Sequence, residues 1–432
     1  MKHKIFLLAI LIFFSSFLYA QETRTLTLKE AIEMALKNSR QLKNNESKIR
    51  EALDAVKEAE EKKLPDASVS GSYMYLPVKP TIDMKSGSGN GGPSVSQVVY
   101  GSTNVSLPLY NGGKIRYGIE SARLLAEAVK LDADNDRSQL VLNIINSCIN
   151  LYKAHSAIAL VKENLLQSQQ RVKDFTNLEK NGLLARNDLL KAQLQQSNVE
   201  LSLLDAESNY KLACVNMNIL MGLPEQTVLV PDKNGLALPP AVKTLDEYEQ
   251  EALKGRKDIG ALDYRQKAAM VSLKNTRADR YPSINLTGGY IAADIPKFLS
   301  VYNAINIGVG IRYNIASLWK GKAKENAAKE KIQQLENNHE LLSDNIRLQV
   351  NQAYQAYLVS VKKIEVYEKS EIQATENYRI VKNKYDNALA NTTELLEADV
   401  ALLQAKLGVT NVKADSFLAY NKLLQITGQL NY

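Results

Sequence analysis

Most of the chain repeats its apolar residues at the spacing of an α-helix. Between residues 115 and 180, Leu140, Ile144, Cys148 and Leu151 follow one another in steps of four and three, and no proline interrupts the stretch. A helix of that length would rise about 100 Å, which far exceeds the helices of globular domains. The same periodicity predicts helices over 27–64, 115–180, 187–221, 244–281, 320–386 and 392–427.

Four shorter segments alternate apolar and small polar residues instead. Within residues 67–76, for example, Val69 and Tyr73 are separated by serines and a glycine. This period of two predicts β-strands at about 66–77, 97–110, 283–293 and 301–314. Alternation alone supports equally an ordinary half-buried sheet and the strands of a membrane β-barrel.

The order of helices and strands occurs twice. With an offset of 217 residues, Thr27–Tyr73 lies over Thr244–Tyr290 without a gap, and with an offset of 206 residues Gly222 lies over Gly428. A period this long is not that of a solenoid, so the chain holds two copies of one large unit. The first repeat covers 21–235 and the second covers 236–432.

Tyrosine is over-represented and gathers near the predicted strands. The chain has 21 tyrosines against 7 phenylalanines and 1 tryptophan. Amphipathic aromatic residues collect where a β-barrel crosses the lipid–water interface, so this bias favours membrane strands. The candidate aromatic belt consists of Tyr73, Tyr75, Tyr100, Tyr110, Tyr290, Tyr302 and Tyr313. Four strands cannot close a barrel, and open edges are not tolerated in lipid, so several chains would have to share one barrel.

The first 20 residues have the layout of a secretory signal peptide. Lys2 and Lys4 precede an apolar run from Ile5 to Leu18, and Ala20 follows as a small residue. Its removal lowers the net charge from +7 to +5 by taking away two lysines. No later apolar run reaches 18 residues, so we expect an exported protein without a transmembrane helix.

The sequence offers no chemistry for catalysis. Two cysteines and three histidines are too few and too scattered for a Cys/His metal site, and no nucleophile elbow, phosphate-binding loop or dinucleotide motif occurs. We therefore expect no enzyme, no cofactor, no metal and, for an exported protein, no nucleic-acid partner. The basic segment KGKAK at 320–324 is interpreted as a solvated helix start or as a contact with lipid phosphates.

These features resemble the outer-membrane efflux protein family, the TolC-like exit ducts of bacterial export pumps. The resemblance rests on LTLKEAIEMALKNS, on KKLPDASVSGSY with its counterpart DRYPSINLTGGY, on SLPLYNGGK and on NGLLARNDLLKAQ, and it spans the mature chain. It implies a mixed, mainly α-helical fold in which long antiparallel hairpins form a periplasmic α-barrel. Each protomer of a homotrimer would add four strands to a twelve-stranded outer-membrane β-barrel.

The resemblance also implies a function and partners. The protein would be a passive, gated channel of a tripartite efflux or type I secretion system, set in the outer membrane and extending into the periplasm. Its tip would contact a periplasmic adaptor, and an inner-membrane pump of the RND or ABC type would supply the energy. The alternative is a periplasmic coiled-coil adaptor or binding protein, which has one hairpin and no lipid-type strands. A secreted enzyme is a third class, without a supporting residue cluster.

In the family, acidic residues at the start of the final helix narrow the entrance. The matching residues here are Glu394 and Glu397, which share a helix face at a spacing of three. Asn391 with Glu394 is also the pattern of a helix-capping box, which the residues alone favour. The two roles can coexist.

Family tips also lock through polar contacts, and the matching pair here is Asp188 and Tyr385. The family often has a glycine where this chain has Ala388 and a basic residue where it has Ala390, so a salt-bridge lock is not expected. The expected adaptor-contact residues are Gly182, Leu183, Ala388 and Leu389. Gly182 alone is equally explained as a helix C-cap.

Overall fold

The computed structural model describes residues 23–78, 80, 95–232, 242–296 and 299–430. The expected signal peptide at 1–20 lies outside these residues. The described chain forms two compact units. The helical unit comprises the residues up to Asn45, Ala133–Lys257 and the residues from Ser343 onward, and the sheet unit comprises Glu46–Asp132 and Asp258–Leu342. Each unit therefore contains segments of both sequence repeats.

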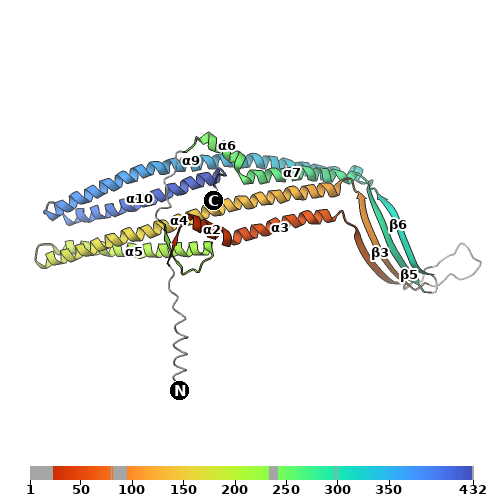
Figure 1. The fold of residues 1–432 in the computed structure, drawn as a ribbon, viewed down its shortest axis with the longest axis horizontal. Coiled ribbons are helices and arrows are strands. Elements are labelled where there is room, and N and C mark those ends of the chain that lie inside the picture. The colour runs from red at the N-terminus through yellow and green to blue at the C-terminus, as the bar shows by residue number, and fades with distance from the viewer. Residues whose placement is uncertain (1–22, 79, 81–94, 233–241, 297–298, 431–432) are drawn as a thin grey trace, which may run out of the picture. The chain divides into compact units, whose positions relative to one another are not determined.

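Two long helical hairpins make up most of the helical unit. The C-terminal part of α4 (Lys114–Lys180) lies beside α5 (Arg186–Met221), and the C-terminal part of α9 (Lys322–Asp386) lies beside α10 (Thr392–Ile426), as Figure 1 shows. These four helices begin and end within two residues of the expected positions. Within the described residues, no helix has both the length and the apolar character that crossing a membrane requires.

The opening helix of each repeat is interrupted, which corrects the expected single helices over 27–64 and 244–281. The first is divided into α2 (Leu28–Asn38) and α3 (Arg40–Glu61), and the second into α6 (Leu245–Gly255) and α7 (Lys257–Arg277), followed by a 3₁₀ turn at Ala278–Arg280. The breaks at Ser39 and Arg256 have extended ψ angles of 121° and 132°. They are 217 residues apart, so both copies bend at the same position.

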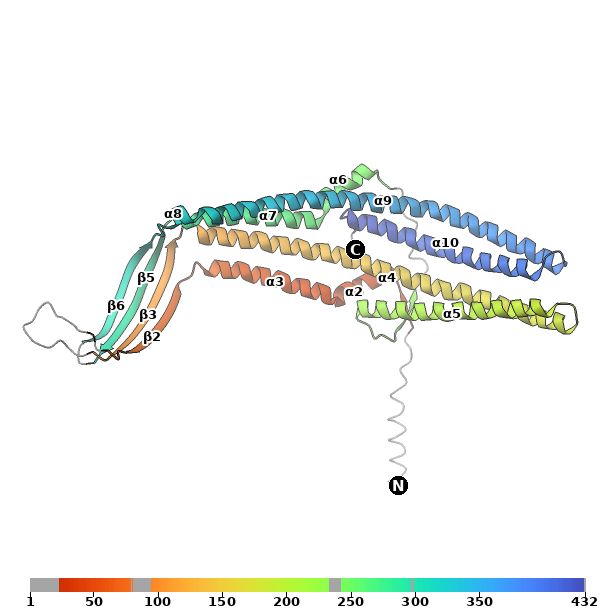
Figure 2. The same cartoon turned by 180° about the vertical axis from the view of Figure 1, so that it is seen from behind.

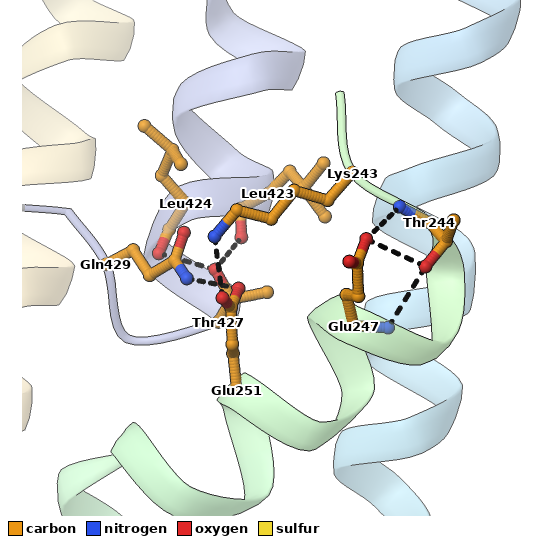
Figure 3. A network of polar contacts seen from close by, with 8 residues as sticks. All are labelled: Lys243, Thr244, Glu247, Glu251, Leu423, Leu424, Thr427 and Gln429. Atoms are coloured by element: carbon orange, nitrogen blue, oxygen red, sulfur yellow. Dashed lines mark hydrogen bonds and ion pairs between the residues drawn. The ribbon is translucent and has the colours of Figure 1, made fainter. Parts of the chain in front are cut away.

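Both copies begin and end with the same local chemistry. The hydroxyl of Thr27 accepts from the Glu30 N–H and that of Thr244 accepts from the Glu247 N–H, which makes a capping box at each start. Figure 3 shows the second box, with the Lys243–Glu251 ion pair at 2.6 Å beside it. A glycine follows the final helix of each copy, Gly222 directly after α5 and Gly428 two residues after α10, and their φ angles of 71° and 73° are left-handed. The two repeats therefore share the chemistry of their helix ends as well as their residue types.

A short parallel sheet in the helical unit was not expected. β1 (Thr23–Leu26) pairs with β4 (Val228–Pro231), and each strand has only four residues. It packs on the unit's largest apolar core. The largest fully buried side chains of that core are Ile32, Ile144, Ile145, Ile149, Leu151, Met217, Met221 and Leu229.

The sheet unit contains four antiparallel strands in the order β2-β3-β5-β6. They are β2 (Asp66–Tyr75), β3 (Gln97–Tyr110), β5 (Ser283–Ile295) and β6 (Leu299–Arg312). β3 has the bounds that the alternation predicts, β2 and β5 differ from theirs by two residues at their C-terminal ends, and β6 begins and ends two residues earlier than expected. The second long helix was expected from residue 320, but a four-residue helix α8 (Ser317–Lys320) precedes α9 (Figure 2).

The register of the strands gathers the apolar residues on one face of the sheet. Tyr73 lies opposite Val99, Thr103 lies opposite Tyr290, and Tyr290 lies opposite Ile305, so the alternations of all four strands are in phase. The apolar face carries Val69, Tyr73, Tyr75, Val99, Val105, Leu107, Ile284, Leu286, Tyr290, Ile305, Ile307, Val309 and Ile311. The opposite face carries Ser68, Ser70, Ser72, Ser102, Asn104, Ser106, Asn285, Thr287 and Asn306.

Candidate functional site

The tip of the first hairpin is a glycine turn. Gly182 has a φ of 72°, and its N–H donates to the Glu179 carbonyl over 2.9 Å. The Leu183 N–H reaches back to the Leu178 carbonyl, also over 2.9 Å, which satisfies the last carbonyls of α4. Gly182 is thus a helix C-cap. Leu183 is 74% exposed at the apex.

The tip of the second hairpin repeats this backbone with an alanine in place of the glycine. Ala388 has a φ of 58°, and its N–H donates to the Tyr385 carbonyl over 2.9 Å. The Leu389 N–H donates to the Lys384 carbonyl over 2.7 Å, and the Leu389 side chain is 76% exposed. A left-handed φ costs an alanine roughly 1–2 kcal/mol. The four proposed adaptor-contact residues therefore occupy equivalent positions in two matching turns.

The two candidate gate residues have different environments. The side-chain oxygen of Asn391 accepts from the Glu394 N–H over 3.0 Å, and the Asn391 N–H donates to the Glu394 carboxylate over 3.3 Å. Glu394 thus belongs to a capping box, the interpretation that the residues alone favoured. Glu397 is exposed and lines a groove of about 380 Å³ between α5 and α10, together with Lys191 and Gln195.

The candidate lock residues lie close together, but each has another partner. The Tyr385 ring stacks on Phe175 with 5.6 Å between centroids, and it belongs to the small apolar core of the tips. Asp188 pairs with Lys191 at 3.4 Å, and Lys191 also donates to the Thr393 hydroxyl of the other hairpin over 3.1 Å. No hydrogen bond among the described residues joins Tyr385 to Asp188.

Burial raises the pKa of Tyr385 above its usual value. A hydrogen bond with the Thr392 side chain opposes this rise in pKa, and the negative charge of Asp188 adds to it. The net upward shift favours the neutral phenol at physiological pH. Asp188 therefore acts on Tyr385 through its charge.

A buried ion pair that the sequence analysis missed joins the two hairpins. The Nη1 atom of Arg171 in α4 lies 2.9 Å from the Oδ2 atom of Asp399 in α10, and the two side chains are 9% and 1% exposed. Asn164 donates to the second oxygen of Asp399 over 3.3 Å, and Arg171 also donates to the Tyr378 hydroxyl over 3.4 Å. The sequence did contain one indication of this pair. Asp399 follows Leu395 by four residues, so an aspartate stands at a position where the helical spacing predicts a buried apolar residue.

The expected aromatic belt divides between the two faces of the sheet. Tyr73, Tyr75 and Tyr290 lie on the apolar face. Tyr110 joins them because a register shift after Pro108 sets it opposite Ile284. Tyr100 lies opposite Ser72 on the polar face. The two remaining members, Tyr302 and Tyr313, are exposed.

The described residues contain no group of three or more His, Cys, Asp and Glu side chains that could hold a metal ion. Cys148 and Cys214 are free thiols. Burial raises the pKa of the Cys148 thiol to about 12, so it stays protonated and unreactive at neutral pH.

Comparison with solved structures identifies the same fold in several channels. The VceC outer membrane protein of Vibrio cholerae is 18% identical, with 93% of this chain and 96% of VceC covered and a TM-score of 0.75. The CmeC outer membrane channel of Campylobacter jejuni is 19% identical, with 93% and 86% covered and a TM-score of 0.76. A membrane protein from Pseudomonas aeruginosa is 16% identical, with 93% and 90% covered and a TM-score of 0.80.

Sequence comparison gives the family. No curated protein matches the chain. The sequence profile described as "Outer membrane efflux protein" matches residues 31–223 and 249–429, which is well over half of the chain and includes both hairpins and all four strands of the sheet. This chain therefore belongs to the outer membrane efflux protein family.

Proposed function

We propose that this chain is one protomer of a homotrimeric outer-membrane channel that serves a tripartite efflux or type I secretion system. The observation that carries the proposal is the sheet, which has one exposed apolar face and one polar face. Ile305 and Ile307 are 80% and 86% exposed on the apolar face. Exposed isoleucines at alternate positions suit a surface that faces lipid, while the serines of the opposite face suit a water-filled lumen.

The edges of the sheet support a shared barrel. β2 and β6 are its edge strands, so within the described residues each has one side without a strand partner. Unpaired backbone groups in lipid cost several kcal/mol each, so β2 of one copy would have to pair with β6 of the next. Three copies would close a twelve-stranded barrel with a lumen wide enough for cargo.

The helical hairpins would form the periplasmic part of the duct. Leu183 and Leu389 are exposed at equivalent turns, where they offer apolar contacts to a periplasmic adaptor protein. The adaptor would connect the channel to an inner-membrane pump of the RND or ABC type. The chain would act as a passive conduit and the pump would supply the energy.

Glu394 and Glu397 would set the charge of the channel entrance. In a trimer, these residues supply six carboxylates near one axis, which attract cations and repel anions. Glu397 would have the larger effect, because the Glu394 carboxylate also accepts a hydrogen bond from its own helix cap. Tyr385, with the nearby charge of Asp188, would hold the tips closed through the stack on Phe175.

Membrane fractionation tests the proposed function. We expect an SDS-resistant trimer in the outer-membrane fraction whose migration changes on heating. Recovery of the mature protein as a soluble periplasmic monomer would contradict the channel and favour the alternative of an adaptor or binding protein.

A further inference from the structure

The connection from strand to long helix differs between the two repeats. In the first, three residues separate Tyr110 from Lys114, and Gly112 and Gly113 make the turn with φ angles of 67° and 86°. In the second, eight residues separate Tyr313 from Lys322, and they include α8. The extra residues are not needed to turn the chain, because the first repeat turns without them.

The longer connection contains a short helix and exposes three apolar side chains. Ser317 is buried and donates its hydroxyl to the Asn314 carbonyl over 2.6 Å, which fixes the start of α8. Leu318 and Trp319 are 58% and 66% exposed, and Ile315 just before them is 59% exposed. Trp319 is the only tryptophan of the chain.

These residues continue the apolar face of the sheet. The alternation of Ile307, Val309 and Ile311 on β6 runs on in the sequence through Tyr313 and Ile315, which are also exposed. Figure 2 shows α8 at the end of the sheet where β6 meets the long helix α9. If the apolar face of β6 faces lipid, this apolar surface continues beyond the strand as far as α8.

The charge around this connection is strongly positive. Residues 277–281 and 312–329 contain seven basic and two acidic residues. Both acids are already paired: Asp279 with Lys114 and Lys324, and Glu325 with Arg277, Arg280 and Lys329. Lys320 and Lys322 are exposed, and no ion pair of the described residues includes them.

We propose that Ile315, Leu318 and Trp319 insert into the periplasmic leaflet of the outer membrane while Lys320 and Lys322 bind the phosphates of anionic phospholipids. This lipid anchor rests on the proposed membrane insertion of the sheet. Tryptophan favours the depth of the headgroups, and a lysine next to an anionic surface strengthens binding about fivefold. The anchor would fix how deeply the barrel sits, and only the second repeat supplies it.

Quenching of the single tryptophan tests the anchor. The mature protein is reconstituted in vesicles of phosphatidylcholine or phosphatidylglycerol whose acyl chains carry bromine at a shallow position. We expect bromine to quench Trp319, and phosphatidylglycerol to associate at this site at least fivefold more strongly than phosphatidylcholine. The Lys320→Gln/Lys322→Gln variant should lose that preference. The control variant Lys362→Gln/Lys363→Gln removes two positive charges from a distant part of α9 and should keep the preference for phosphatidylglycerol.

A second single-tryptophan variant separates the anchor from insertion of the sheet. Trp319→Phe/Ile307→Trp moves the probe to the apolar face of β6, where deeply placed bromine should quench it. If this variant is quenched while Trp319 in the parent protein is not, the anchor is wrong and the membrane sheet stands; a blue-shifted, unquenched Trp319 would place α8 against a protein surface. If neither probe is quenched, both proposals fail.

Discussion

The two hairpin tips have the same backbone but opposite helix-end chemistry. The first has a glycine at its left-handed position, whereas the second has Ala388 there. At the start of the helix that follows each turn, the second tip has the favourable residue and the first does not. Ala185 makes no side-chain cap on α5, whereas Asn391 makes a complete capping box on α10. Each tip is therefore well suited at one helix end and poorly suited at the other.

The acidic residues that follow the two turns have also diverged. Asp188 and Glu394 are equivalent at the offset of 206 residues. Asp188 forms an ion pair with Lys191, while Glu394 accepts from its own helix cap. The duplicated tips therefore kept the same backbone while their polar contacts diverged. In the second tip the first acidic residue, Glu394, is held by the backbone of its own helix start.

The largest effect should come from breaking the ion pair that joins the two hairpins. Arg171→Met leaves the carboxylate of Asp399 buried without its partner, which should cost about 3–5 kcal/mol of folding stability. Loss of the helical circular-dichroism signal with denaturant measures this. Replacing both partners, as in Arg171→Met/Asp399→Leu, should recover most of the lost folding stability.

A more exposed ion pair within the first tip provides the control. Glu179 and Arg186 lie 3.4 Å apart, with Arg186 65% exposed, and Glu179→Gln should cost at most about 1 kcal/mol. If Arg171→Met were no more destabilising than Glu179→Gln, the buried pair would not hold the hairpins together.

Exchanging glycine and alanine between the tips should have opposite effects. Ala388→Gly relieves the left-handed strain and should stabilise the second tip by about 1 kcal/mol, while Gly182→Ala should destabilise the first by a similar amount. No atom lies within 4 Å of a Cβ built on Gly182, so only the backbone conformation should contribute. Thermal unfolding should show a higher melting temperature for Ala388→Gly and a lower one for Gly182→Ala. Melting temperatures that both rise or both fall would contradict the equivalence of the two turns.

Exchanging the helix caps should have an effect no larger than that of exchanging glycine and alanine. Asn391→Ala removes the capping box of α10 and should cost about 1 kcal/mol, whereas Ala185→Ser should stabilise α5 by somewhat less. The backbone at Ala185 is already extended, with φ −69° and ψ 143°, so a serine there can reach the N–H of Asp188. The same unfolding measurement applies, and a neutral Asn391→Ala would show that the box contributes nothing to the second tip.

The smallest effect should be the alkaline titration of Tyr385. Its pKa is raised in the folded protein, so the stability it contributes is complete below about pH 10, the usual tyrosine pKa, and is lost as the pH rises through the folded-state pKa. Tyr385→Phe should remove that alkaline loss. Tyr367→Phe, at an exposed tyrosine on the same helix, should not. Melting temperatures from pH 8 to 12 provide the comparison.

The sheet was the most predictable part of the molecule. The alternation located β3 to the residue, and the strands share one apolar face because their register preserves the phase of that alternation. The ends of the helices at the tips could also be predicted, because the segment NGLLAR interrupts the helical periodicity of apolar residues. The breaks at Ser39 and Arg256 were not, because apolar spacing continues across them and only the backbone torsions change.

Contacts between distant segments were beyond the sequence. β1 and β4 are four residues each and pair across about half of the chain, so no local pattern marks them. Arg171 and Asp399 lie on helices whose relative rotation is set by packing, which spacing along one helix does not reveal. For the same reason the family resemblance suggests Asp188 and Tyr385 as a pair but does not identify Lys191, Thr393 or Phe175 as their partners.

Single-channel recording in a planar lipid bilayer measures directly whether this chain forms a channel with an acidic entrance. The wild-type protein should form cation-selective pores. Glu397→Gln should reduce the reversal potential in a salt gradient more than Glu394→Gln, because Glu397 is exposed beside the groove while Glu394 is held in the capping box. Absence of pores, or unchanged selectivity in the Glu394→Gln/Glu397→Gln double variant, would contradict a channel whose entrance charge comes from the second tip.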